Sequence, residues 1–279
     1  MPEEINYFIF SCLQSFFLGL IQGFTEFLPI SSTAHLKVIP YLFGLRDPGV
    51  SISASLQLGS AFAILFYFRD QISVIVNSFF TSFKQRKIVK DNNIKLAIYI
   101  FVASIPIFLI GLVIKLMWPD FSDSNFRGLF FIAIISILMA ILLALSEIYG
   151  QKDKLFKDIK FKDVFIIGIS QSLAIFPGVS RSGITLSSAL FSGIERQTAA
   201  RISFLIGIPA ITASGFVEFI SLYNTLNLID IFPIIFGIIS SFFSSLFSIN
   251  FFLKFLAKNN TFIFVYYRLF FGFFILISL

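Results

Sequence analysis

The sequence EFLPISSTAHL, residues 26–36, places an acid, three hydroxyl side chains and a histidine directly after an apolar segment, FIFSCLQSFFLGLIQGF (8–24). Pro29 is expected to break the helix that the apolar segment forms. His35 is the single histidine of the chain. So many polar groups at one helix break indicate a turn that is kept inside an apolar protein for a chemical purpose.

The rest of the chain indicates an all-α polytopic membrane protein. Of its 279 residues, 57% are hydrophobic and 13% are charged. Apolar stretches such as 96–116 and 128–145 recur along its length, and a helix needs about 20 apolar residues to cross a bilayer. The first apolar run follows the acidic segment MPEEIN, so we expect it to be retained rather than cleaved as a signal. Cys12 is the only cysteine, which excludes an internal disulfide.

The positive charges indicate membrane topology rather than nucleic-acid binding. The net charge is +6, and Lys and Arg gather in three short segments: 84–95, 151–163 and 254–258. The segments WPDFSDSN (118–125) and SLYNTLNLID (221–230) have no Lys or Arg. The positive-inside rule therefore places the first three in the cytoplasm, and the last two and the amino terminus outside.

This orientation predicts six transmembrane helices plus two re-entrant helical hairpins. The hairpins are expected at 5–45 and 163–194, because only segments that enter and leave on one side keep the loops on their assigned sides. Such backbone is tolerated in a membrane where it is buried in protein or faces a water-filled cavity. The full spans are expected near 51–83, 96–117, 126–148, 197–222, 230–253 and 262–279.

A weak internal repeat supports the two hairpins. Gly19 and Gln22 match Gly168 and Gln171 at an offset of 149 residues. Three further matches lie at an offset of 148: Pro29 with Pro177, Ser32 with Ser180, and Gly59 with Gly207. We interpret the chain as one domain, 1–279, with repeat A at about 1–148 and repeat B at about 163–279 in an inverted-topology repeat. Such repeats place a binding site where their broken helices meet; chance similarity between apolar segments is the alternative.

The first hairpin carries candidate catalytic groups. Gln22 and Glu26 are four residues apart and share a helix face. After the break, Ser31, Ser32 or Thr33 can cap the next helix. Ser32 and His35 are three residues apart, so they too can share a face.

The second hairpin tip, PGVSRSGIT (177–185), has the features of an anion site. Pro177 and Gly178 break the helix, and Ser180 or Ser182 can cap the helix after the break. Arg181 lies beside the free N–H groups of that helix start, which favour phosphate. An ionisable group at membrane depth costs about 2.5–3.5 kcal/mol and usually marks function. The alternatives are a structural Glu26–Arg181 ion pair and serines that only cap.

These two motifs resemble a known family. QGFTEFLPISSTAH (22–35) and PGVSRSGIT (177–185) are similar to the signatures of the bacterial undecaprenyl-diphosphatases, also called bacitracin-resistance proteins: E/Q-x-x-x-E before P-x-S-S-T-x-H, and P-G-x-S-R-S-x-x-T. The resemblance spans the whole chain, including SLQLGSAFAI (55–64). Many members have Glu where this chain has Gln22, which can offer a carbonyl oxygen but cannot act as a base.

The resemblance implies an enzyme of the bacterial cytoplasmic membrane that hydrolyses undecaprenyl diphosphate to undecaprenyl phosphate and inorganic phosphate. This reaction recycles the lipid carrier for peptidoglycan synthesis, and the family confers bacitracin resistance. The resemblance also implies a divalent cation, Mg²⁺ or Ca²⁺, and a site that opens to the outer side. The partner is a polyprenyl diphosphate lipid and not a nucleic acid. The oligomeric state is left open, with a homodimer as one arrangement.

Together, the motifs and the resemblance assign roles as hypotheses. Arg181 would hold the diphosphate and stabilise its charge. Glu26 would either bind the metal, with Gln22 as a second ligand, or orient the attacking group. Ser32 or a water molecule would be the nucleophile, and His35 would be the acid or base. The expected diphosphate contacts are Ser31, Thr33, Ser180, Arg181, Ser182 and Thr185. The rival reading is an inverted-repeat transporter or flippase for a polyprenyl phosphate or another anion, which needs binding groups but no nucleophile.

Overall fold

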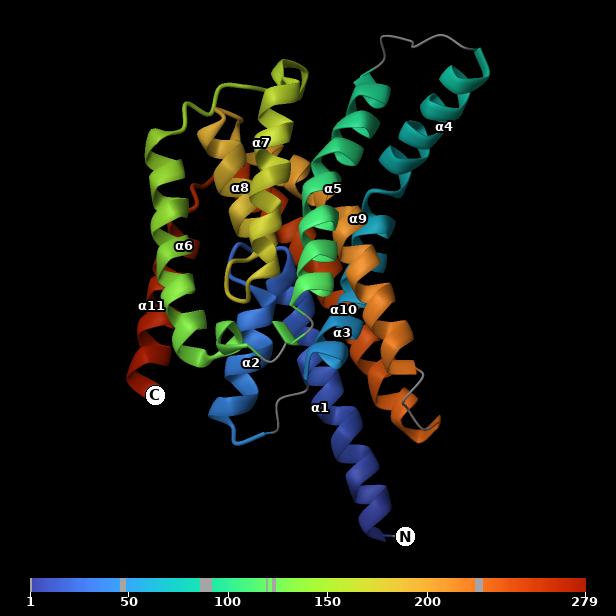
Figure 1. The fold of residues 1–279 in the computed structure, drawn as a ribbon, viewed down its shortest axis with the longest axis vertical. Helices are drawn as coiled ribbons and strands as arrows, with labels where there is room; N and C mark the ends of the chain where they lie inside the picture. Colours follow the sequence, from blue (N-terminus) through green and yellow to red (C-terminus); the bar gives the residue numbers. More distant parts are fainter. Residues whose placement is uncertain (1, 46–48, 86–91, 119, 122–123, 224–227) are drawn as a thin grey trace.

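The computed structural model describes residues 2–45, 49–85, 92–118, 120–121, 124–223 and 228–279, and in these ranges it has helices and no β-strand (Figure 1). Short 3-10 helices occur at Asn125–Arg127, Phe156–Asp158 and Ser172–Ile175. The α-helices are α1 (Pro2–Glu26), α2 (Ser32–Leu42), α3 (Gly49–Tyr67), α4 (Arg69–Gln85), α5 (Asn92–Met117), α6 (Leu129–Tyr149), α7 (Phe161–Gln171), α8 (Arg181–Phe191), α9 (Arg196–Tyr223), α10 (Leu228–Leu256) and α11 (Phe262–Ser278). The prediction of an all-α protein is confirmed.

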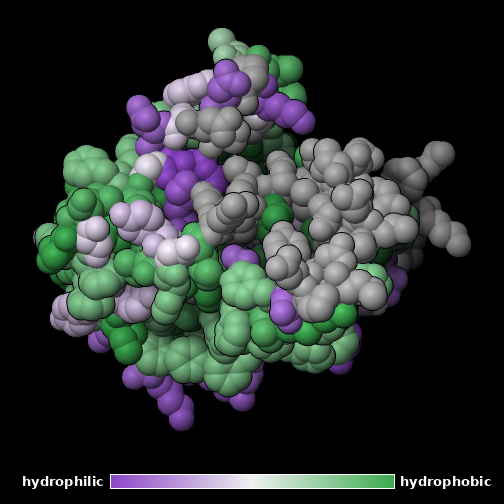
Figure 2. Space-filling view, turned by 90° about the horizontal axis from the view of Figure 1, so that it is seen from below, coloured by the Kyte–Doolittle hydropathy of each residue, from purple (hydrophilic) through white to green (hydrophobic). Residues whose placement is uncertain are grey.

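The lengths and apolar character of the helices are those of a multi-span membrane protein. Among the described residues, α1, α5, α6, α9 and α10 each contain a segment long and apolar enough to cross a membrane. The bent pair α3 and α4 would add a sixth span. Apolar side chains cover much of the described surface seen from the end where α1 begins (Figure 2). Large apolar side chains are also exposed along the helices, among them Phe101, Phe130 and Phe270, as expected for contact with lipid.

Two helical hairpins enter the bundle from opposite ends and meet near its middle (Figure 1). The first consists of α1 and α2, and the second of α7, a 3-10 turn (Ser172–Ile175) and α8. Their tips are joined by hydrogen bonds from Ser182 Oγ to Leu28 O, 2.8 Å, and from Gly178 N to Thr33 Oγ1, 3.5 Å. The division into inverted repeats stays a prediction.

The two tips share an unusual backbone geometry. Ser31, the N-cap of α2, has φ 74° and ψ 100°, and Ser180, the N-cap of α8, has φ 69° and ψ 111°. Positive φ is uncommon for a residue other than glycine and persists where the surroundings impose it. Ser31 and Ser180 therefore occupy equivalent positions in the two tips. They are 149 residues apart, the same offset as Gln22 and Gln171. The sequence match had instead paired Ser180 with Ser32.

The bends and lengths of three helices bear on the predicted spans. The span predicted at 51–83 is two helices bent by 72°, and α4 begins at the charged pair Arg69 and Asp70, where the apolar run ends. The arm α1, assigned to a re-entrant hairpin, is itself long enough to span. By contrast, α11 has 17 residues and rises only about 26 Å, slightly less than a bilayer core.

Close packing between α1 and α10 fixes the position of the first hairpin. A Cβ on Gly23 would lie 2.0 Å from Ser244 Oγ and 2.5 Å from Ser241 O. Along the same contact, Ser240 Oγ donates to Phe16 O at 2.8 Å. Small residues that let helix backbones approach, together with hydroxyl groups that bond across the gap, are typical of helix association in membranes.

Substitution of Gly23 by Leu is expected to separate α1 from α10. Overpacking costs about 1–3 kcal/mol, and at about 2–4 °C per kcal/mol the Tm of the purified protein should fall by about 5 °C. Gly111→Leu is the matched control, because a Cβ on Gly111 of α5 meets no atom within 4 Å. Equal Tm values for the two variants would contradict this packing.

Candidate active site

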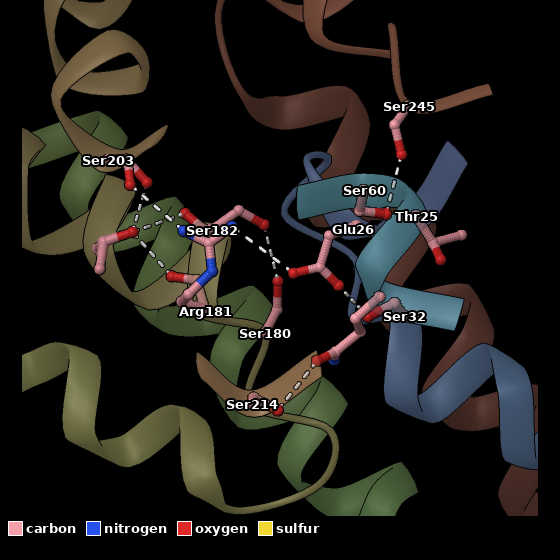
Figure 3. A network of polar contacts seen from close by, with 12 residues as sticks. Thr25, Glu26, Ser32, Ser60, Ser180, Arg181, Ser182, Ser203, Ser214 and Ser245 are labelled. Carbon is pink, nitrogen blue, oxygen red and sulfur yellow. Dashed lines mark hydrogen bonds and ion pairs between the residues drawn. The ribbon is translucent and has the colours of Figure 1, made fainter. Parts of the chain in front are cut away.

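A polar cluster at the hairpin tips consists of Gln22, Glu26, Ser32 and Arg181. Glu26 lies at its centre (Figure 3). It is the last residue of α1 and is buried. Its Oε2 accepts hydrogen bonds from Gln22 Nε2 at 2.9 Å and from Ser32 Oγ at 2.7 Å. Its Oε1 lies 3.6 Å from Arg181 NH2 of the second hairpin. The structure thus brings together the acid and serine of the first motif and the arginine of the second.

The start of α2 presents three consecutive hydroxyl side chains. Ser31 Oγ accepts a hydrogen bond from Ala34 N at 3.4 Å and lies 3.1 Å from Thr33 Oγ1. Thr33 Oγ1 also accepts the bond from Gly178 N of the second tip. Because the first N–H groups of a helix have no partner within it, this hydroxyl-rich start favours an anion.

The start of α8 is built in the same way, with one exception. Ser180 Oγ accepts from Gly183 N at 3.2 Å and lies 3.2 Å from Ser182 Oγ. Thr185, predicted as a diphosphate contact, instead donates to Arg181 O at 2.7 Å and contacts Ser203 Oγ of α9. Its hydroxyl is therefore engaged inside the α8–α9 contact rather than at the tip.

Arg181 has N–H donors that make no hydrogen bond. Its side chain is 9% exposed, and NH1 donates to Ser203 O at 3.3 Å. The buried Nε and NH2 make no hydrogen bond, although NH2 faces Glu26. Gly207 leaves room for the guanidinium, since a Cβ there would lie 1.7 Å from Arg181 NH1. An arginine held in this way can bind the oxygens of a phosphate in a forked geometry.

His35 is held by groups outside the cluster. Its Nδ1 lies 2.7 Å from Ser31 O, and its Nε2 lies 2.6 Å from the hydroxyl of Tyr267. The ring stacks on Phe271, with centroids 4.3 Å apart. A carbonyl only accepts, so Nδ1–H donates to Ser31 O, and in the neutral ring Nε2 accepts from Tyr267.

The position of His35 changes which group is the best candidate for the base. The sequence placed Ser32 and His35 on one helix face, but the structure does not join them by a hydrogen bond. The hydroxyl of Ser32 donates instead to the carboxylate of Glu26. Glu26 is therefore the group placed to accept a proton from Ser32.

Two residues of α11, Tyr267 and Arg268, contact the first hairpin or both tips and were not among the site residues predicted from the sequence. Arg268 is fully buried and donates to the carbonyl oxygens of Pro29 and Gly178, one in each tip. The signal was present in the sequence, because Arg268 is the only charged residue within the apolar segment 262–278, and such residues usually mark function.

The cluster has oxygen ligands for a hard cation, but not a complete set. Gln22 Oε1 is buried beside Glu26 and has no hydrogen-bond partner. In the described part of the chain, no three or more His, Cys, Asp or Glu side chains gather to hold a metal. Mg²⁺ commonly takes one or two protein carboxylates, and substrate phosphates and water complete its shell. The donors of Glu26 and Gln22 fit an ion held in that way.

Comparison with known proteins gives consistent matches over almost the whole chain. The family described as Bacitracin resistance protein BacA matches residues 15–274. A protein of Prochlorococcus marinus strain NATL1A named undecaprenyl-diphosphatase is 70% identical over 279 residues, which is 100% of both chains. A Synechococcus protein (strain CC9311) with the same name is 41% identical over 267 residues, 96% of this chain and 94% of its own.

The matched region contains both hairpin tips and all the residues of the polar cluster. The match to the family covers far more than half of the chain, and the Prochlorococcus relative is similar from end to end. This chain is therefore a member of the bacitracin resistance protein BacA family.

Proposed function

We propose that the protein hydrolyses undecaprenyl diphosphate to undecaprenyl phosphate and inorganic phosphate, which recycles the lipid carrier for peptidoglycan synthesis and confers resistance to bacitracin. The observation that carries the proposal is the meeting of Glu26, Ser32 and Arg181 at the hairpin tips. Relatives up to 70% identical bear the name of this activity. A polar centre inside an apolar bundle also suits a substrate with a diphosphate head and a polyprenyl tail.

The geometry favours Ser32 as the nucleophile. Ser32 Oγ would attack the terminal phosphorus while Glu26 takes its proton, and the bond from that phosphorus to the bridging oxygen would break, releasing undecaprenyl phosphate. Glu26 would pass this proton to the departing undecaprenyl phosphate and so be free to act again. Water would then attack the phosphoserine and lose a proton to Glu26, and the bond from phosphorus to Ser32 Oγ would break. Glu26 would return the proton to that oxygen as inorganic phosphate is released. The unpartnered donors of Arg181 would stabilise the charge on the phosphoryl oxygens in both steps.

A divalent cation, Mg²⁺ or Ca²⁺, is part of the proposal. Glu26 and Gln22 would hold it together with the diphosphate itself. When bound, it would neutralise charge on the diphosphate oxygens. Arg181 faces Oε1 of Glu26, which leaves Oε2 for the cation. One carboxylate can therefore interact with both Arg181 and the cation.

We further propose that the protein lies in the cytoplasmic membrane with the site open to the outer side. The first hairpin enters from the end of the molecule where α1 begins (Figure 1), which the distribution of Lys and Arg assigns to the outside. A homodimer stays a prediction. A transporter or flippase would need the binding groups, but the hydrogen bond from Ser32 to Glu26 favours an enzyme.

Loss of either charge at the tips is expected to abolish turnover. Glu26→Gln and Arg181→Ala should each lower kcat by about 100-fold or more, because one removes the proton acceptor and the other the phosphoryl-binding donors. The measurement is phosphate release from undecaprenyl diphosphate by purified protein. Glu147→Gln, which alters the buried ion pair of Glu147 with Arg196 outside the cluster, is the control and should keep kcat. Wild-type rates in Glu26→Gln would refute the assignment.

Removal of the Ser32 hydroxyl distinguishes a serine nucleophile from water. Ser32→Ala should lower kcat by at least about 1,000-fold. Mass spectrometry of wild-type protein quenched during turnover should find phosphate on Ser32. A Ser32→Ala variant with near-full turnover would show that water attacks directly.

The metal proposal predicts dependence on Mg²⁺. Chelation should stop phosphate release, and added Mg²⁺ should restore it. Gln22→Ala should raise the Mg²⁺ concentration needed for half-maximal rate by about 10-fold, because the variant lacks one oxygen ligand. An unchanged rate in excess chelator would exclude this role for Glu26 and Gln22.

A further inference from the structure

Arg268 in the middle of α11 has an unusual set of partners. The side chain is 1% exposed. Its NH1 donates to Pro29 O at 3.1 Å and to Val179 O at 3.4 Å, and its NH2 donates to Gly178 O at 2.6 Å. Its Nε donates to Ser136 O of α6 at 3.2 Å. All four acceptors are backbone carbonyl groups.

The two carbonyls at the tips occupy equivalent places. Pro29 lies two residues before the cap Ser31, and Gly178 lies two residues before the cap Ser180. Ser31 and Ser180 are the two caps with the matched positive φ. One guanidinium group therefore bridges the same carbonyl of both hairpin tips, immediately before the two helix starts that can bind anions.

Stability alone does not account for this residue. Among the ion pairs of the described residues, none includes Arg268. A buried charge that lacks an oppositely charged partner is costly inside a membrane protein, and such residues are usually functional. The planar fork of arginine can satisfy two carbonyls at a fixed separation, which the single ammonium group of lysine cannot do in the same geometry.

The chemistry of the substrate explains why the separation matters. In the proposed reaction, groups from both tips act on one headgroup, since Ser32 belongs to α2 and Arg181 to α8. A displacement of about 1 Å in such an arrangement can cost about 100-fold in rate. Besides Arg268, three contacts join the tips: the Glu26–Arg181 ion pair, the hydrogen bond from Ser182 Oγ to Leu28 O, and the hydrogen bond from Gly178 N to Thr33 Oγ1.

We propose that Arg268 is a positioning residue that holds the two hairpin tips at the separation at which Ser32 and Arg181 act on the same diphosphate. This inference rests on the proposed function. It assigns Arg268 no contact with the substrate. Its loss should therefore affect the rate of the bound complex far more than substrate binding.

The test is the kinetics of Arg268→Lys, which keeps the charge and removes the fork. We expect kcat for undecaprenyl diphosphate to fall by about 100-fold and KM to stay within about threefold. Thr261→Val is the matched control at the start of the same helix, because it removes the buried bond from Thr261 Oγ1 to Glu147 Oε2, 2.8 Å, away from the tips. The control should lower Tm and leave kcat unchanged.

A second variant keeps the inference testable if Arg268→Lys does not fold. Ser182 was expected from the sequence to contact the diphosphate, but its hydroxyl instead donates to Leu28 O of the other tip at 2.8 Å. Ser182→Ala removes this bond between the tips, so kcat should fall by about 10-fold at unchanged KM. When both variants fold, their combined effect on kcat should be smaller than the product of the single effects, because both act on one separation.

The outcomes are distinct. Wild-type kcat in Arg268→Lys overturns the inference and leaves the proposed function intact. An unchanged kcat in Ser182→Ala does the same if Arg268→Lys is unfolded. A change confined to KM in either variant also overturns it, since that result indicates substrate contact. If the wild type releases no phosphate in Mg²⁺, both the proposed function and the inference fail.

Discussion

The contact between a buried carboxylate and a buried guanidinium, Glu26 on one hairpin and Arg181 on the other, is the interaction on which the site depends. Each charge would be costly inside an apolar bundle without the other. Because the partners belong to different hairpins, neither hairpin can form the site alone. The same contact leaves one carboxylate oxygen bonded to Ser32 and two nitrogens of Arg181 without hydrogen bonds. Glu26 and Arg181, which neutralise each other's charge in the resting protein, are thus also placed to take part in the reaction.

The sequence predicted the parts of the site that depend on local rules. The spacing of Gln22 and Glu26 places them on one helix face, and they form the expected hydrogen bond. Residues after a helix break favour an N-cap, and Ser31 and Ser180 are caps. The cost of charge at membrane depth singled out Glu26 and Arg181, which the structure brings together. The long apolar segments likewise predicted the all-α class, because the length of each segment can be read from the sequence and about 20 apolar residues form a membrane-spanning helix.

Features that depend on contacts distant in sequence could not be predicted in this way. The spacing of Ser32 and His35 allowed a contact, but His35 bonds to Tyr267, which is 232 residues away. Thr185 turns toward Ser203 of α9, and no local pattern specifies that neighbour. The break between α3 and α4 coincides with Arg69 and Asp70, charges that could equally end a straight span at the interface.

In the proposed enzyme, the two hairpin tips together bind the reacting diphosphate. The most direct measurement is an experimental structure of the protein with Mg²⁺ and a methylene-bridged analogue of undecaprenyl diphosphate, which cannot be hydrolysed. The terminal phosphonate is expected between the starts of α2 and α8, within hydrogen-bond distance of Ser32 Oγ and the Arg181 guanidinium. A diphosphonate bound elsewhere, with Glu26 and Arg181 still paired as they are here, would contradict this expectation.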